Sequence, residues 1–140
     1  MIGNIKAKAI HSPGHTPADM TYLIDGILFT GDTLFAPDMG TARCDFPGGS
    51  AETMYDSVRR LLETLPEETQ MYICHDYPEG KNRELIYVTT IKDQRKHNIH
   101  VRDGITKQEF VKLRKERDMT LDLPSYIFPA VQINGNAGSI

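Results

Sequence analysis

The sequence predicts a protein in which strands and helices alternate, of either the α/β or the α+β class. Two observations support this prediction. Residues 5–10 alternate between polar and apolar side chains for most of their length, as a half-buried strand does, whereas residues 54–65 carry apolar side chains at helical spacing. Turn-forming residues separate such segments along the chain, and the length of 140 residues fits one domain.

Two more short strands are expected after the first, in residues 20–24 and 27–30. Asp25-Gly26 between them is typical of a two-residue hairpin turn, because glycine accepts the positive φ that such turns need. Residues 36–50 are rich in glycine, proline and aspartate, so we expect a long loop there.

A helix is expected after this loop, because Ser50 is a good N-cap and the apolar residues that follow recur at helical spacing. Pro66 follows the last turn of this helix. Residues 71–74 are then expected to form a short apolar strand, and residues 89–97 a polar helix. At the far end of the chain, residues 123–140 are expected to be irregular.

A last helix is predicted by a capping box, in which Thr106 is followed three residues later by Glu109. We expect this helix to run to about Met119. The side chains that it is expected to turn inward are Phe110 and Leu113.

The composition is that of a globular protein with little net charge, since 39% of residues are apolar and 25% are charged. A formal charge of −3 predicts no general attraction to nucleic acid or to membrane surfaces. No apolar run reaches the length of a membrane span, and no signal pattern opens the chain. Cys44 and Cys74 are not in Cys-x-x-Cys spacing, so we expect no disulfide framework and a cytoplasmic location.

Two short motifs follow strands and carry residues that can bind a metal. His15 lies in the turn Pro13-Gly14-His15-Thr16, whose short backbone favours a pre-ordered ligand, although a loop histidine more commonly bonds a nearby carbonyl. Asp32 follows the strand at 27–30, where α/β proteins usually bind ligands. Its carboxylate suits iron, zinc and manganese alike, although a lone Gly-Asp more commonly caps the turn.

A third motif, His75-Asp76-Tyr77, follows the strand at 71–74. Another histidine at a strand end is again a candidate ligand, and the alternative is a histidine satisfied by hydrogen bonding. For Cys74 the alternative is stronger, because a free cysteine is usually a small buried hydrophobic residue. Each of these signals is weak alone, but their order along the chain is specific.

The composite order resembles the metallo-β-lactamase superfamily, over about residues 5–100. It consists of a strand, Pro-Gly-His-Thr, a hairpin ending in Thr-Gly-Asp-Thr, a helix, and a strand ending in His-Asp-Tyr. The resemblance implies an α/β fold of the αββα type, of which this chain supplies one mixed sheet with its covering helices. It also implies three metal ligands, namely His15, Asp32 and His75.

A finer resemblance concerns the segment Gly40-Thr41-Ala42-Arg43-Cys44-Asp45-Phe46. Persulfide dioxygenases carry a similar Gly-x-x-Arg-x-Asp-Phe stretch together with His-Asp-Tyr, whereas glyoxalase II enzymes tend to have Gly-Lys-Phe-x-Glu-Gly and His-Glu-Tyr. This favours iron(II)-dependent oxidation of glutathione persulfide over zinc-dependent hydrolysis of a glutathione thioester. The same resemblance implies that Arg43, Tyr77 and Arg95 contact the glutathione substrate, although a surface ion pair or a helix-end contact is the ordinary alternative.

The sequence departs from the superfamily in one respect. The motif His-x-His-x-Asp-His, which precedes the others in the family, does not occur in these 140 residues. We therefore expect the chain to be the C-terminal portion of a single metallo-β-lactamase domain, inactive alone and a poor binder of catalytic metal. A non-catalytic half-domain that acts only in assembly is a further alternative.

Half of a two-sheet sandwich leaves one sheet face uncovered, so we expect a homo-oligomer. The residues expected to line this face are Ala7, Leu23, Leu28 and Ile73. We also expect the metal-facing atoms of His15, Asp32 and His75 to lie within roughly 6 Å of one another, as ligands about 2 Å from a shared ion would.

Overall fold

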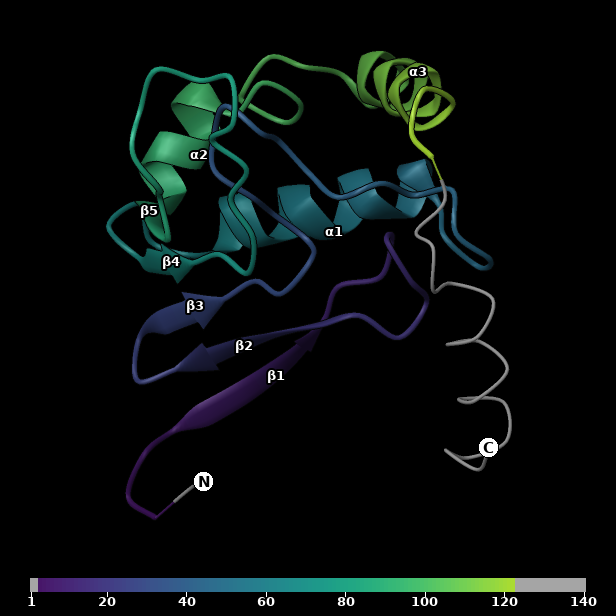
Figure 1. Cartoon of the computed structure of the whole chain (residues 1–140). Coiled ribbons are helices and arrows are strands. Elements are labelled where there is room, and N and C mark those ends of the chain that lie inside the picture. Colours follow the sequence, from purple (N-terminus) through teal and green to yellow (C-terminus); the bar gives the residue numbers. More distant parts are fainter. Residues whose placement is uncertain (1–2, 123–140) are drawn as a thin grey trace, which may run out of the picture.

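The computed structural model describes residues 3–122 as one five-stranded mixed sheet with three helices (Figure 1). This confirms the α/β class. The predicted irregular segment at 123–140 lies outside the described residues. In chain order the elements are β1 (Ala7–His11), β2 (Met20–Ile24), β3 (Ile27–Phe29), α1 (Ala51–Thr64), β4 (Gln70–Tyr72), β5 (Val88–Thr90), α2 (Ile91–His97) and α3 (Lys107–Asp118).

The strands lie in the order β1-β2-β3-β4-β5. The first three form an antiparallel meander, and the hairpin between β2 and β3 turns on Asp25 and Gly26, which both have positive φ. Strand β4 is parallel to β3, with Phe29 opposite Tyr72, and α1 makes the crossover between them (Figure 1). Since parallel strands end at the same sheet edge, the loops after β3 and β4 are neighbours.

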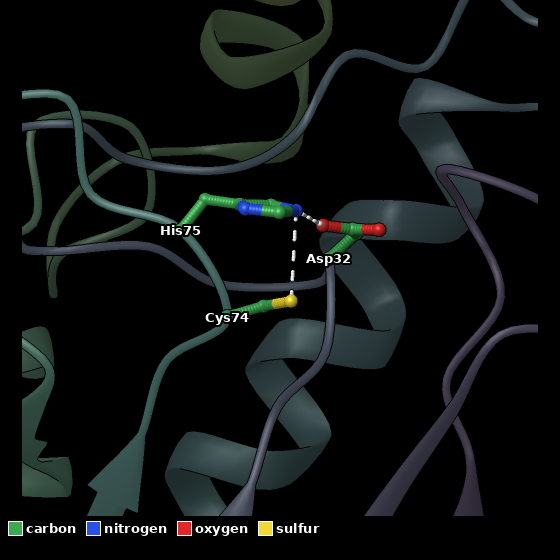
Figure 2. A group of neighbouring side chains, drawn as sticks. All are labelled: Asp32, Cys74 and His75. Carbon is green, nitrogen blue, oxygen red and sulfur yellow. Dashed lines mark hydrogen bonds and ion pairs between the residues drawn. The ribbon is translucent and has the colours of Figure 1, made fainter.

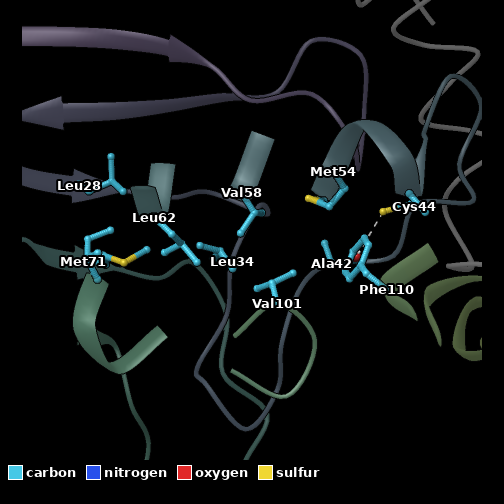
Figure 3. Packing of buried hydrophobic residues seen from close by; sticks show 12 residues of the cluster. Leu28, Leu34, Ala42, Cys44, Met54, Val58, Leu62, Met71, Val101 and Phe110 are labelled. Carbon is cyan, nitrogen blue, oxygen red and sulfur yellow. Dashed lines mark hydrogen bonds between the residues drawn. The ribbon is translucent and has the colours of Figure 1, made fainter. Parts of the chain in front are cut away.

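Helix α1 begins at the predicted cap, where the Ser50 hydroxyl accepts a hydrogen bond of 3.2 Å from the backbone N–H of Thr53. Its apolar stripe packs on one sheet face, and α2 and α3 complete the core around it (Figure 3). Each large apolar side chain buried there stabilises the fold by about 1.5–3 kcal/mol. The core residues are Leu28, Leu34, Ala42, Cys44, Ala51, Met54, Val58, Leu62, Met71, Ile91, Val101 and Phe110.

The last two helices differ from the prediction in two details. Residues 88–90 form strand β5, so α2 begins at Ile91 with the Thr90 hydroxyl as its cap. The capping box of α3 is confirmed, and Phe110 is fully buried. Leu113, however, is 36% exposed, and Arg114 is buried in its place because its guanidinium donates to the buried Thr41 carbonyl.

The sheet face away from the helices carries a row of apolar side chains. Tyr22, Phe29, Tyr72 and Val88 stand opposite one another on four neighbouring strands and are 36–45% exposed. The Phe29 and Tyr72 rings are 5.5 Å apart. We call these four residues the aromatic row.

The residues predicted to line this face belong largely to the other one. Leu28 is fully buried, Ile73 is buried, and Leu23 packs against the core, which leaves only Ala7 exposed as predicted. The cause is the two-residue period of a strand, because an error of one residue assigns every side chain to the wrong face.

None of the helices among residues 3–122 is both long enough and apolar enough to span a membrane.

Candidate metal centre and its cavity

Asp32 is placed by the tight turn that ends β3. The Thr30 hydroxyl donates to the Leu34 carbonyl at 3.0 Å, which closes the turn. Gly31 within it has a φ of +52°, a conformation that costs glycine little. The Asp32 side chain is 39% exposed and lines a cavity at this sheet edge.

His75 reaches the same place from the neighbouring strand. It follows β4, and its Nε2 lies 3.1 Å from Oδ1 of Asp32 (Figure 2). The Cys74 sulfur lies 3.5 Å from the same Nε2. Cys74 is exposed rather than buried, which corrects the expectation of a small buried residue. Burial of part of its surface, followed by the charge of Asp32, raises the pKa of the Cys74 thiol.

Two aromatic rings contact the imidazole of His75. The Tyr77 ring stacks on it at a centroid distance of 5.9 Å, and the Phe35 ring meets it edge-on at 6.2 Å. The two aromatic rings also meet each other edge-on at 6.4 Å. Such contacts fix the plane of the imidazole and so the direction of its Nε2.

An arginine fixes the loop that carries His75. The Arg83 guanidinium donates two hydrogen bonds of 2.7 Å to Asp76 and further ones of 2.7 and 2.8 Å to Asp38 in the opposite loop. Asp76 also accepts from the backbone N–H of Ile86 at 2.7 Å. The Arg83 hydrogen bonds hold the pKa values of Asp76 and Asp38 below their usual range. Through these two bidentate contacts, Arg83 joins the loop that carries Asp76 to the loop that carries Asp38.

His15 lies in a turn that packs closely on α1. A Cβ on Gly14 would lie 2.5 Å from Cα of Met54, so only glycine allows this approach. The Ser57 hydroxyl donates to the Pro13 carbonyl at 2.7 Å and fixes the turn further. Nδ1 of His15 lies 2.7 Å from the Arg43 carbonyl, which only accepts, so Nδ1 carries the hydrogen. Nε2 is then the nitrogen with the free lone pair.

The cavity has a volume of about 1000 Å³ and contains five of the six predicted site residues. These are His15, Asp32, His75, Arg43 and Tyr77. The role of each as a metal ligand or substrate contact stays a prediction. Among residues 3–122, one group of three or more His, Cys, Asp and Glu residues has its ligand atoms within 4.8 Å of one another, and it consists of Asp32, Cys74 and His75. His15 lines the same cavity but does not belong to this group.

The sixth predicted residue, Arg95, does not line the cavity. It pairs with Glu67 at 3.4 Å and with Asp103 at 2.9 Å. This is the ordinary surface ion pair that was the alternative interpretation for this residue. A charged helix offers no sequence signal that distinguishes an arginine facing the cavity from one facing its outer neighbours.

Arg43 lines the cavity but already has partners of its own. It donates to both carboxylate oxygens of Asp45, at 2.6 and 2.7 Å, and to the Asp122 carbonyl at 2.7 Å. Its guanidinium also stacks on the Phe46 ring at 4.8 Å. The Arg43 hydrogen bonds lower the pKa of Asp45. Arg43 is thus held in a fixed orientation at the cavity wall.

Sequence reasoning missed further residues of the cavity wall, on the segment from 99 to 117. His100 is buried, and its Nδ1 accepts a hydrogen bond of 3.0 Å from the backbone N–H of Thr41. Arg114 and Arg117 of α3 also line the cavity. None of the three belongs to a recognisable motif: Arg114 and Arg117 are brought in by the packing of α3, and His100 lies in the segment before that helix. Cys74 could have been selected from the sequence as a candidate ligand, because it directly precedes His75.

Comparisons with known proteins agree with this geometry. The model of the metallo-beta-lactamase superfamily matches residues 1–75. The chain is 49% identical over 140 residues to a curated protein of Dictyostelium discoideum named Glyoxylase B2, covering 99% of this chain and 47% of that protein. It is 35% identical over 129 residues to the mitochondrial persulfide dioxygenase ETHE1 of Homo sapiens, covering 91% of this chain and 46% of the relative.

Solved structures give the same result. The crystal structure of ETHE1 from Myxococcus xanthus matches with a TM-score of 0.82 and 36% identity, covering 99% of this chain and 57% of that one. Other matches include a Bacillus subtilis protein named as a zinc-dependent hydrolase and a solved structure described as di-iron-bound, so members of the family bind metals.

The comparisons cover only part of each relative. The chain spans about half the length of the curated relatives that it matches. Within that span, a family match over more than half of the chain coincides with a sheet edge that brings Asp32 and His75 to 3.1 Å. The chain belongs to the metallo-β-lactamase superfamily.

Proposed function

We propose that this chain contributes metal ligands and substrate contacts to an enzyme that oxidises glutathione persulfide. The observation that carries the proposal is the pair of Asp32 and His75 at 3.1 Å, in a cavity that also contains His15. Two imidazoles and a carboxylate are the donors that non-haem iron(II) oxygenases use. The identity to a named persulfide dioxygenase and the Gly-x-x-Arg-x-Asp-Phe stretch support the same reaction.

The donor set fits iron(II) or zinc, because both accept nitrogen and carboxylate ligands. Bound iron would supply the activation of dioxygen. The residues of the chain orient the donors: the Arg43 carbonyl fixes the tautomer of His15, and the ring of Tyr77 fixes the plane of His75.

Cationic side chains in the cavity wall support a glutathione substrate. Glutathione derivatives are anionic, and the wall carries the cations Arg43, Lys81, Arg114 and Arg117 together with the anions Asp32, Asp38 and Glu79. Arg117 would bind a glutathione carboxylate with its guanidinium fork while the sulfur faces the metal donors. Arg43, whose guanidinium already donates to Asp45 and to the Asp122 carbonyl, would contribute its charge and its remaining N–H. The two free cysteines among the described residues suit a reducing compartment such as the cytoplasm.

Hydrolysis of a glutathione thioester is the second candidate. It is favoured by the 49% identity to a protein named Glyoxylase B2, a higher value than the identity to the human dioxygenase. The motif His75-Asp76-Tyr77 favours the dioxygenase instead, because glyoxalase II enzymes tend to have glutamate in the middle position. The two reactions also differ in the metal, with one iron against a dinuclear site containing zinc.

The choice between persulfide oxidation and thioester hydrolysis is tested with a chimera. In this chimera, residues 1–140 replace the matching segment of the Dictyostelium relative. We expect one iron per chimera after anaerobic loading, and oxygen uptake with glutathione persulfide. Release of thiol from a glutathione thioester by a dinuclear protein, without oxygen uptake, would establish the hydrolase and reject the proposal. The 140-residue chain alone serves as the comparison and is expected to show neither activity.

Substitutions in the chimera test the substrate site. Arg43→Ala should mainly raise KM, because binding a remote carboxylate stabilises ground and transition states alike. Arg95→Ala is the matched control, because Arg95 pairs with Glu67 and Asp103 away from the cavity. A large loss of kcat at unchanged KM in Arg43→Ala would place this residue at the metal instead.

A further inference from the structure

Three donors of different chemistry meet at the end of the parallel strands. One ligand atom each from Asp32, Cys74 and His75 lies within 4.8 Å of the other two (Figure 2). The thiol of Cys74 belongs to no motif that relates the chain to its family. It is exposed beside the cavity, whereas the other cysteine, Cys44, is buried in the core.

The separations match those around a tetrahedral ion. A thiolate at about 2.3 Å and an imidazole nitrogen at about 2.0 Å from such an ion lie about 3.5 Å apart, and a carboxylate oxygen lies about 3.3 Å from that nitrogen. The structure gives 3.5 Å between Cys74 Sγ and His75 Nε2, and 3.1 Å between His75 Nε2 and Asp32 Oδ1. The remaining pair is at most 4.8 Å apart, and the part-exposed Asp32 has room to close that gap.

Hydrogen bonding accounts for part of this arrangement. The Nε2–H of His75 can donate to the Asp32 carboxylate at 3.1 Å, with the Cys74 sulfur at 3.5 Å as a weak second acceptor. A cation satisfies all three atoms together, because each offers it a lone pair.

We propose that Cys74 is a third metal ligand, so that Asp32, Cys74 and His75 form a site for a thiophilic divalent cation such as zinc. Three protein ligands leave the fourth tetrahedral position open, as catalytic zinc sites do. The thiolate shifts the preference of the site from iron(II) toward zinc. This changes the sequence-based expectation of poor metal binding, because the chain supplies a complete three-ligand set without any other polypeptide. Since the two candidate reactions differ in their metal, a preference for zinc favours the second candidate, hydrolysis of a thioester.

Cobalt(II) is the probe, because a cobalt–thiolate bond gives a charge-transfer band in the near ultraviolet. The 140-residue chain, reduced and free of metal, is titrated with cobalt(II) and followed by absorbance. We expect one ion per chain together with this band. Cys74→Ser should abolish the band and weaken binding by more than the about 10- to 100-fold typical of an outer-shell partner. Cys44→Ser should keep both, provided that its circular dichroism shows a folded protein.

A measurement on the unsubstituted chain avoids dependence on the folding of any variant. Zinc should slow alkylation of Cys74 by iodoacetamide at least about 10-fold by mass spectrometry, in line with its role as ligand. Cobalt bound without the sulfur band, or zinc without protection of Cys74, would overturn the proposal while leaving Asp32 and His75 as ligands. Absence of any binding to the 140-residue chain would overturn the three-ligand site, whereas the metal site of the proposed function is tested separately in the chimera.

Discussion

His100 gives the chain a stability that depends on pH over a defined range. The side chain is buried, with the residue 7% exposed, and its Nδ1 accepts from the Thr41 N–H. Burial, and to a smaller extent the charges of Arg114 and Arg117, lowers the pKa of His100 from 6.5 to about 4. The folded chain therefore keeps this imidazole neutral at a pH where the unfolded chain protonates it.

The sign and size of the effect follow from linkage. Because the folded pKa is the lower one, the contribution is fully present above pH 6.5 and is lost as pH falls from 6.5 to about 4. At about 1.4 kcal/mol per pKa unit, the loss is about 3 kcal/mol. His100→Asn removes the titrating group and offers a carbonyl oxygen to the Thr41 N–H, so its free energy of unfolding should vary less over this range.

Urea denaturation followed by circular dichroism at several pH values between 4 and 7.5 measures the effect. The unsubstituted chain should lose about 3 kcal/mol more than His100→Asn over that range. His97→Asn, on the exposed surface of α2, controls for the loss of a histidine as such. Parallel pH profiles for the unsubstituted chain and His100→Asn would refute the reasoning, because they would mean that the buried ring does not titrate differently in the two states.

Three further substitutions test other contacts. Arg114→Leu leaves the buried carboxylate of Asp118 without its partner at 2.6 Å, and should lower the free energy of unfolding by about 3–5 kcal/mol in urea; a loss below about 1 kcal/mol would contradict this. Gly14→Ala puts a methyl group 2.5 Å from Met54 and should cost about 1–3 kcal/mol, whereas an unchanged melting temperature would mean that the turn has room to move. Phe29→Lys in the aromatic row should reduce the molar mass by light scattering if the chain self-associates through this face, and an equal mass would exclude the face from association.

Local signals predicted the elements that depend on local chemistry. The hairpin at Asp25 and Gly26, the cap at Ser50 and the capping box at Thr106 were all read correctly, because each depends on residues only a few positions apart. Strand β5 was missed, since three residues are too few to establish a two-residue period.

Non-local packing determines what the sequence does not reveal. Arg114 is buried only because the Thr41 carbonyl and Asp118 lie in reach, and no pattern along α3 distinguishes it from an exposed arginine. The exposure of Cys74 likewise depends on how the loop after β4 leaves the sheet. The convergence of Asp32 and His75, by contrast, could be predicted, because both follow neighbouring strands and carry a family motif.

The parallel pairing of β3 with β4 has a consequence for the order of folding. The hairpins among β1, β2 and β3 close over a few residues, whereas Thr30 and Tyr72 meet across 42 positions, with α1 as the crossover. We expect closure of this long loop to be the entropically costly and slow step of folding. Asp32 and His75 come together only when it is complete. A cation that binds both therefore stabilises the finished crossover over chains in which the early hairpins alone have formed.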